Sequence, residues 1–377
     1  RPDWCISRQR YWGVPIPLFT HKDDQRIHPN TPDLLNQIAD KVEDQGIDAW
    51  FDAGIEEFLG DDANSYEKST DTMDVWMDSG IAHKTVSCLF DHIKDEADLY
   101  LEGSDQHRGW FQSSLLTSVA INSHAPYKEV LTHGFVVDEK GHKMSKSLGN
   151  TVSPQSIVNN MGADILRLWV ASTDYSSEMK ISDQILKRNG DTYRRIRNTA
   201  RFLLSNLSDF DPSKNQKKVD DLVLLDQLAI QRVSVLNEQI KNEYNNYSFH
   251  KIVQLLHNFC VNDMGGFYLD ILKDRLYTMP PDSSGRRSAQ TALYVIAESL
   301  TLWIAPILSF TSEEIWKHLP ERKEESVFLS EWLHIDNPES DVDWDQLNEI
   351  NAIVLKALEV ARDDGAIGSP LDAHLEI

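Results

Sequence analysis

The segment Gly141-His142-Lys143-Met144-Ser145-Lys146-Ser147-Leu148-Gly149 places two lysines three residues apart on a loop bounded by glycines. Two ammonium groups at this spacing can close on a polyphosphate and neutralise the charge that develops when it is cleaved. The hydroxyls of Ser145 and Ser147 add phosphate donors or hold the loop in shape. No Walker A sequence and no GxGxxG occurs in the chain, so neither standard glycine loop holds a nucleotide here. The alternative is an exposed Lys/Ser loop without a ligand.

The sequence around this loop has the texture of alternating strands and helices. Residues 1–190 mix short apolar runs with Gly, Pro and Asp. Strands are expected at 99–101 and 130–137. A Ser-Pro pair at 153–154 is typical of a helix start, and a second helix is expected from Ala163. This part of the chain is therefore predicted to be an α/β domain.

Long amphipathic helices are predicted after residue 190. Apolar residues recur at spacings of three and four over 225–244 and again over 293–307, which is the helical period. Thr311 and Glu314 form a capping-box pattern, which predicts a helix N-terminus there. Residues 191–377 are therefore predicted to form an all-α bundle, so two domains are expected.

Charge is distributed unevenly along the chain. Its 377 residues include 37 lysines and arginines against 60 acidic residues, and this net charge of −23 excludes a surface that coats nucleic acid or anionic membrane as a whole. The acidic stretch 54–74 is expected to be a solvated surface insertion. The segment 187–218 is instead rich in lysine and arginine. Such a local excess is typical of a phosphate-backbone contact, with an ordinary solvated helix face as the alternative.

The sequence also bears on metals and membranes. Its three cysteines lack CxxC spacing and its histidines form no HExxH pair, so no zinc site is expected within the chain. So few thiols are typical of a reducing, cytoplasmic compartment. The most apolar stretch, 293–310, is interrupted by Glu298, so no membrane association is expected. The chain lacks an initiator methionine and is expected to be a fragment of a longer protein.

The lysine loop matches KMSKS, the second signature of the class I aminoacyl-tRNA synthetases, and the chain is identified as a member of that family. Other stretches resemble the isoleucine enzymes of bacterial type within it. They are WCISRQRYWG at 4–13, DVWMDSG at 74–80, YLEGSDQHRGWF at 100–111 and FYLDILKDRLY at 267–277. Together these stretches extend over nearly the whole chain.

The resemblance implies a fold and a reaction. Residues 1–190 would be the C-terminal half of a Rossmann-type catalytic domain, and 191–377 an anticodon-binding helical bundle truncated at its C-terminus. The parent protein would form isoleucyl-adenylate from isoleucine and ATP with Mg²⁺, and then transfer isoleucine to tRNA(Ile), as a cytoplasmic monomer. Lys143 and Lys146 would be catalytic, because they would neutralise charge on the phosphates.

The resemblance also assigns binding residues. The loop after strand 99–101 lies where open α/β sheets bind ligands, and an acidic surface turn is the alternative. Its glycine lets a ligand approach the backbone, and its aspartate is suited to ribose hydroxyls. The residues implied to bind ATP or the adenylate are Glu102, Gly103, Asp105, Gln106, His133, Gly134, Phe135, Val136, Met144, Ser145 and Ser147.

Two further groups of residues are assigned in the same way. Trp76 and Trp110 match the tryptophans that line the amino-acid pocket, where a flat indole complements a branched aliphatic chain; ordinary core packing is the alternative. The tRNA contact is predicted at Arg194, Arg195 and Arg197, at the start of the helical bundle.

The chain also departs from the family pattern. The first class I signature, His-Ile-Gly-His, is absent from these residues, as are the bulk of an editing domain and the zinc module common in bacterial relatives. The chain alone is therefore expected to be inactive. The alternatives are a valyl- or leucyl-tRNA synthetase fragment, or a non-catalytic tRNA-binding synthetase remnant. An unrelated nucleotidyltransferase would leave the helical half unexplained.

Overall fold

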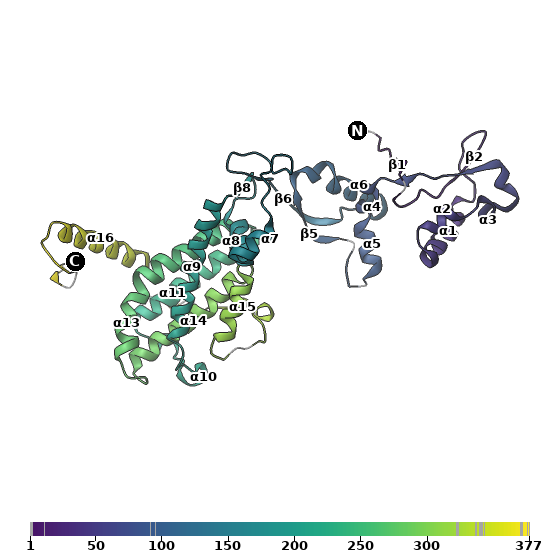
Figure 1. Cartoon of the computed structure of the whole chain (residues 1–377). Helices are drawn as coiled ribbons and strands as arrows, with labels where there is room; N and C mark the ends of the chain where they lie inside the picture. Colours follow the sequence, from purple (N-terminus) through teal and green to yellow (C-terminus); the bar gives the residue numbers. More distant parts are fainter. Residues whose placement is uncertain are drawn as a thin grey trace. The chain divides into compact units, whose positions relative to one another are not determined.

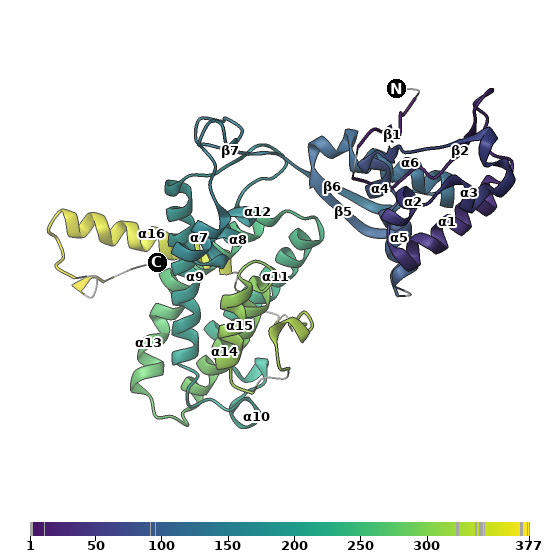
Figure 2. The ribbon, with the colours of Figure 1, turned by 45° about the vertical axis from the view of Figure 1, so that its right-hand side comes forward.

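The chain forms two compact units. The computed structural model describes residues 3–10, 12–90, 92–94, 96–321, 324–335, 338, 342, 344–369, 372–374 and 376. By their internal contacts these residues separate into Arg1–Gly134 and Phe135–Ile377, whose elements are labelled in Figure 1 and seen from another side in Figure 2. This division differs from the predicted domain boundary at residue 190, which rests on the change to long amphipathic helices and on the family resemblance and stays a prediction.

The first unit is built from short strands and helices. Its elements are β1 (Ser7–Arg8), β2 (Phe19–His21), α1 (Thr31–Gln45), α2 (Asp48–Asp52), α3 (Ile55–Leu59), the 3₁₀ helix η1 (Gly60–Ser65), β3 (Tyr66–Lys68), β4 (Thr72–Met73), α4 (Val75–Gly80), α5 (Ala82–Leu89), β5 (Ala97–Gly103), η2 (Ser104–Arg108), α6 (Trp110–Asn122) and β6 (Tyr127–His133). Strand β1 pairs with β4 and β2 with β3, both antiparallel, whereas β5 and β6 are parallel.

The parallel pair decides the class of this unit. Strand β5 runs through η2 and α6 into β6, with Leu99 opposite Glu129 and Gly103 opposite His133. Parallel neighbours require such a crossover, and strand–helix–strand is the repeating element of a Rossmann-type fold. The predicted α/β class and the strand predicted at 99–101 are therefore confirmed.

The strand predicted over 130–137 is wrong in its extent. Strand β6 ends at His133, and Val136–Val137 form a separate strand, β7, which pairs in parallel with β8 (Met179–Lys180). The break has a visible cause, because the carbonyl of Phe135 accepts a hydrogen bond from the amide of Met179 (2.8 Å) and so joins a different sheet.

The acidic stretch 54–74 is not simply a solvated insertion. Phe58 and other apolar side chains of α3, with Tyr66 of β3, pack on a buried cluster that includes Phe19 and Trp50. Lys68 is turned inward, and its Nζ donates to the carbonyls of Trp50 (2.5 Å) and Ala53 (2.6 Å). Burial lowers the pKa of Lys68, against the raising effect of nearby carboxylates. The stretch is thus a fixed layer with an acidic outer face.

The second unit is mainly helical. Its elements are β7, α7 (Pro154–Met161), α8 (Ala163–Ser172), β8, α9 (Asp183–Ser205), α10 (Pro212–Asn215), η3 (Val219–Asp221), α11 (Leu224–Asn245), α12 (Phe249–Asn258), the π-helix η4 (Phe259–Tyr268), α13 (Leu269–Thr278), α14 (Ser284–Ile304), α15 (Ser309–His318), η5 (Val327–Leu329) and α16 (Trp344–Asp363). Helices α7, α8 and α11 confirm three predicted helices. The one predicted over 293–307 is α14, which already ends at Ile304.

One extensive core fills the bundle. Helices α9, α11 and α14 lie side by side (Figure 1), and their facing residues, such as Leu203, Leu236 and Trp303, are fully buried. The core also holds a charge, because the buried carboxylate of Asp226 accepts hydrogen bonds from Arg275 (2.7 and 2.8 Å) and from two hydroxyl groups. The predicted all-α bundle is confirmed.

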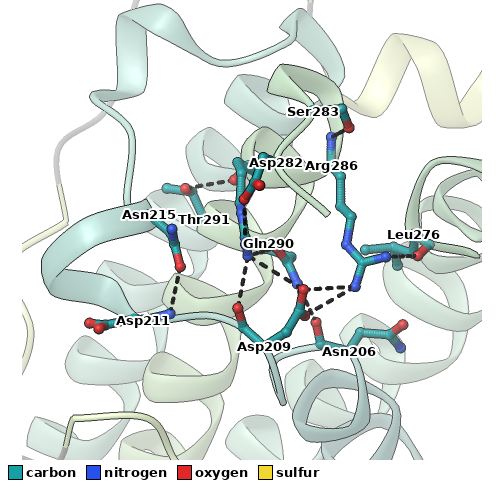
Figure 3. Close-up of polar contacts among 11 residues, drawn as sticks. Asn206, Asp209, Asp211, Asn215, Leu276, Asp282, Ser283, Arg286, Gln290 and Thr291 are labelled. Atoms are coloured by element: carbon teal, nitrogen blue, oxygen red, sulfur yellow. Dashed lines mark hydrogen bonds and ion pairs between the residues drawn. The ribbon is translucent and has the colours of Figure 1, made fainter. Parts of the chain in front are cut away.

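A polar clamp at the start of α14 fixes the loop that follows α9 (Figure 3). Arg286 donates to both carboxylate oxygens of Asp209 (3.0 Å each), and Gln290 donates to Asp209 (2.7 Å) and to the carbonyl of Asn206 (2.9 Å). Burial raises the pKa of Asp209, but the bonds from Gln290 and Arg286 outweigh it and hold that pKa below its usual range. The clamp is therefore present at neutral pH, and it is lost as the pH falls through this lowered value.

The capping box predicted at Thr311 and Glu314 is wrong. Helix α15 already begins at Ser309, so Thr311 lies inside its first turn. Its amide (2.8 Å) and its hydroxyl (2.6 Å) both donate to the buried carboxylate of Asp164, on α8. Asp164 thus supplies from another helix the acceptor that a capping side chain supplies locally. Nearby, Arg167 of α8 donates to the carbonyls of Pro306 (2.8 Å) and Ile307 (2.9 Å).

This arrangement gives a stability prediction. Asp164→Ala should lower the free energy of unfolding of the helical unit by about 1–2 kcal/mol, since it removes the acceptor for the first turn of α15. Glu314→Ala is the matched control, and it should change that free energy by less than about 0.5 kcal/mol because Glu314 is exposed. Urea titration followed by helical circular dichroism measures both. A larger loss for Glu314→Ala would restore the capping box.

Candidate functional site

The first group of predicted site residues follows strand β5. Gly103 ends the strand, is buried, and lies opposite His133 in the parallel register. A Cβ added at Gly103 would lie 2.7 Å from Oδ1 of Asp105, so a larger residue here would displace the Asp105 carboxylate from its place in the turn. The turn brings the carboxyl ends of β5 and β6 together, which is the edge where α/β sheets bind ligands.

Some polar side chains of this turn are held by hydrogen bonds within the protein, and others are exposed and can bind a ligand. Oε1 of Gln106 accepts from the amide of Trp110 (3.0 Å), and its Nε2 donates to Asp105 (3.2 Å). Gln106 therefore caps α6 and orients the neighbouring carboxylate. Glu102 and Asp105 are exposed and can accept hydroxyl donors, while a ring nitrogen of His133 lies 2.9 Å from the carbonyl of Gly134.

The two predicted pocket tryptophans both lie near Gly109: Trp76 contacts it and Trp110 follows it in the chain. The ring of Trp76 reaches within 3.0 Å of a Cβ added there, and the ring of Trp110 stacks on Tyr100 at 4.2 Å and 8°. Trp110 also lines a cavity of about 550 Å³ with Tyr100, but Trp76 does not. That cavity includes the first residues of β5, so it lies toward the opposite ends of the strands from Gly103.

One residue that ties this region together was missed in the sequence. The buried carboxylate of Asp74 caps α4 by accepting from the amide of Trp76 (3.3 Å). It also accepts from Nε1 of Trp4 (3.2 Å) and from the guanidinium of Arg8 (2.5 Å). Asp74 thus joins the stretches 4–13 and 74–80, although Tyr11 of the first lies outside the described residues. An aspartate just before a helix is a capping signal that the sequence did offer.

The lysine loop forms the second group of predicted residues. Nζ of Lys143 lies 3.6 Å from the centre of the Phe135 ring, a cation–π contact that holds this ammonium near the start of β7. Met144 packs on a small core that includes Trp169 and Met179. Lys146 is exposed. Met144 therefore anchors the loop on this small core, and the ammonium group of Lys146 is left in contact with solvent.

A hydrogen-bond network keeps this loop in shape. Asp138 accepts from the amides of Lys140 (3.0 Å) and His142 (2.9 Å) and from the side chain of Asn150 (3.0 Å). Oδ1 of Asn150 accepts in turn from the amide of Ser145 (2.9 Å). The bond from Asn150, followed by that from His142, lowers the pKa of Asp138, so this half-buried group is a carboxylate at neutral pH.

The third group lies on α9. Arg194, Arg195 and Arg197 are all exposed, and Arg194 pairs with Asp191. Spacings of three, four and seven on a helix place residues on neighbouring strips of one surface. The exposed basic residues of α9 are Lys187, Arg188, Arg194, Arg195, Arg197 and Arg201. We call these six the basic stripe. The remaining basic residues of the segment follow α9: Lys214 lies on α10, and Lys217 and Lys218 lie in the connection between α10 and η3.

Comparison with known proteins identifies the family. Residues 1–182 match the family of class I tRNA synthetases (I, L, M and V), and residues 226–377 match the anticodon-binding domain of tRNA ligases. The chain belongs to the class I aminoacyl-tRNA synthetases. Both predicted halves of the fold class are thereby confirmed.

Curated relatives place this synthetase chain more narrowly. It is 56% identical over 383 residues to an isoleucine–tRNA ligase of Teredinibacter turnerae and 57% identical over 381 residues to one of Coxiella burnetii. Each match covers all of this chain. The chain spans 41% of the length of these relatives.

A solved structure supports the fold independently. The synthetase chain is similar to a chain of the ternary complex of Agrobacterium radiobacter K84 agnB2 LeuRS, tRNA and LeuAMS, with a TM-score of 0.64 and 19% identity, over 88% of this chain and 42% of that one. At this identity the similarity concerns the fold alone.

The described part of the synthetase chain shows neither a cluster arranged for a metal ion nor a helix suited to cross a membrane. Its histidine, cysteine and acidic side chains form no group of three or more that is arranged to hold a metal ion. None of the helices found there has both the length and the apolar character needed to cross a bilayer.

The network around Asp138 gives a prediction for the lysine loop. Asp138→Ala should speed hydrogen exchange at the amides of Lys140, His142 and Ser145, because two lose their acceptor directly and the third loses the orientation of Asn150. The control is Asp174→Ala, which removes a similar short turn contact with Ser176.

In the control variant Asp174→Ala, hydrogen exchange should change only in the turn that contains Asp174 and Ser176. Acid should have the same effect as Asp138→Ala: a lowered pKa means that the network contributes above the unfolded value near 3.9 and is lost as the pH falls through the folded value. Equal exchange in the unmodified chain and in Asp138→Ala would show that other contacts hold the loop.

Proposed function

We propose that this chain supplies the lysine loop and the tRNA-binding bundle of an ATP-dependent isoleucine–tRNA ligase. The observation that carries the proposal is the lysine loop itself, braced by Asp138 and Asn150 with Lys146 left exposed. The named activity of relatives at 56–57% identity supports isoleucine over valine or leucine. Because the chain spans only part of their length, activity belongs to the longer protein.

The proposed first step is an in-line displacement on ATP. The isoleucine carboxylate attacks the α-phosphorus, the bond to the bridging oxygen breaks, and pyrophosphate leaves. Lys143 and Lys146 would neutralise the negative charge that grows on the leaving group. Magnesium would arrive bound to the phosphates of ATP, since the described residues provide no cluster to hold it on their own.

The remaining residues would bind and orient the reactants. Asp105 and Glu102 would accept from the ribose hydroxyls and the amino group, and Gly103 would let the adenylate approach the backbone. The segment from His133 to Val136 would receive the adenine. Trp76 and Trp110 would shape the side-chain pocket. In the second step a ribose hydroxyl of tRNA(Ile) attacks the adenylate carbonyl and AMP leaves.

The basic stripe is the proposed path of the tRNA. It gathers exposed positive charge on one helix of a protein whose net charge is −23. At physiological salt charges act over about 8–10 Å, so acidic residues elsewhere weaken this local attraction little. We place the protein in the cytoplasm, where aminoacylation serves protein synthesis, as a monomer without membrane association. The second candidate function is that of a non-catalytic tRNA-binding protein, which would bind tRNA through the same basic stripe.

A kinetic prediction separates these two candidates. In the full-length protein, Lys146→Ala should lower kcat for isoleucine-dependent pyrophosphate exchange about 10²–10³-fold with little change in KM for isoleucine, because its charge acts mainly in the transition state. Lys140→Ala, which removes an exposed ammonium just outside the signature, should leave both within about twofold. An unchanged kcat in Lys146→Ala would remove the catalytic role.

An equilibrium prediction tests the tRNA path. Replacing Arg194, Arg195 and Arg197 together by glutamine should weaken binding of tRNA(Ile) and flatten its dependence on salt, by up to about one slope unit per residue that meets a phosphate. The charge-matched control replaces Lys241, Lys251 and Lys317, all exposed on other helices of the same unit. If both triple variants bind tRNA(Ile) with the same affinity, the basic stripe is an ordinary solvated helix face and not a tRNA contact.

A further inference from the structure

A groove lies beside the basic stripe, between α9, the π-helix η4 and α13. It has a volume of about 460 Å³. Arg195 and Asn198 line it from α9, Gly265 and Gly266 from η4, and Asp270 and Lys273 from α13. All six of these residues are exposed, and the groove lies entirely within the second unit.

The π-helix explains why this groove exists. Its wide turn brings the backbone so close to itself that a Cβ on Gly265 would lie 3.1 Å from the carbonyl of Cys260, and one on Gly266 would lie 3.2 Å from that of Val261. A side chain at either position would push the facing carbonyl away by a few tenths of an ångström. The result is a wall of bare backbone that a ligand can approach closely.

The interior of the groove is uncharged. Cys260 is buried, and its burial raises the pKa of the thiol to about 12, so it stays neutral. The hydroxyl of Thr199 lies beside it and donates to the carbonyls of Arg195 (3.1 Å) and Cys260 (3.5 Å). The ligand-recognising charge is therefore confined to the rim.

The rim carries cations on two sides and one carboxylate. Arg195 faces the groove from α9, and Lys273 faces it from α13, where it pairs with Asp270 at 2.6 Å. This ion pair is more than half exposed on both sides, so it is weak and open to exchange with a ligand. Cations on two sides of a groove suit a phosphate. The adjacent carboxylate repels a bare anion but accepts from a hydroxyl, so the combination suits a ribose phosphate.

We propose that this groove seats one ribose-phosphate step of an RNA backbone. Arg195 and Lys273 bind the same phosphate from opposite sides, and Asp270 accepts a hydrogen bond from the adjacent 2′-hydroxyl. Asn198 completes the polar rim. This inference rests on the proposed function, because the RNA is the tRNA that follows the basic stripe. It adds a second contact surface, outside α9, and a reason for the pair of glycines.

The test uses the 377-residue chain and a tRNA(Ile) transcript, with affinity measured against KCl concentration. Arg195→Gln and Lys273→Gln should each weaken binding and lower the salt slope by about one. The double variant should lower it little further, because both cations meet one phosphate. Lys273→Arg should keep the affinity, and Lys241→Gln, an exposed change on α11, should not alter it.

A second arm tests the sugar. The unmodified chain should prefer RNA to a DNA strand of the same sequence, and Asp270→Ala should reduce that preference, because the 2′-hydroxyl loses its acceptor. An undiminished preference would overturn the role of Asp270. Helical circular dichroism of each variant checks folding, which changes at exposed residues should preserve.

The outcomes also separate this inference from the proposed tRNA path. Weaker binding in the triple α9 variant with no effect of Lys273→Gln would overturn the groove and leave the basic stripe standing. Fully additive effects of Arg195→Gln and Lys273→Gln would overturn the shared phosphate. If neither the triple variant nor Lys273→Gln alters tRNA affinity, both proposals fail together.

Discussion

The helical unit depends on one negative charge kept away from water. Asp226 is fully buried on α11, and it accepts hydrogen bonds from Arg275 on α13, Tyr268 at the end of the π-helix and Ser288 on α14. A buried carboxylate without such partners would cost several kcal/mol, so these elements must meet at one point for the bundle to close. Two walls of the groove, η4 and α13, have positions that follow from this meeting, and α9 with its basic stripe packs on the same core.

Local signals in the sequence were sufficient for the long elements and for the lysine loop. Helix α11 was predicted because its apolar spacing is a property of consecutive residues, and the loop because its residue types specify phosphate chemistry at short range. The capping box at Thr311 failed for the opposite reason, since the acceptor comes from Asp164, 147 residues earlier. The π-helix was also missed, because its apolar pattern does not differ visibly from that of an ordinary helix.

The candidate site shows the same division. Gly103 and the lysines were recognisable by type and spacing, whereas the network of Asp138, Asn150 and Ser145 was not, because it depends on how the chain turns at Gly141 and Gly149, which both have positive φ. The function of the charged stripe on α9 was likewise suggested by composition alone. The neighbouring groove could not be predicted from the sequence, because its two rim cations are 78 residues apart and only the fold brings them to the same groove.

Helix α8 has a consequence for how such proteins can be recombined. Its Trp169 belongs to the small core under the lysine loop, while the adjacent Leu168 belongs to the core of the bundle. Asp164 accepts hydrogen bonds from the first turn of α15, and Arg167 donates to carbonyls in the turn between α14 and α15. A chimera that joins the loop of one relative to the bundle of another directly after this helix would split both cores at once. A crossover point that keeps α8 together with both of its partners preserves the native packing.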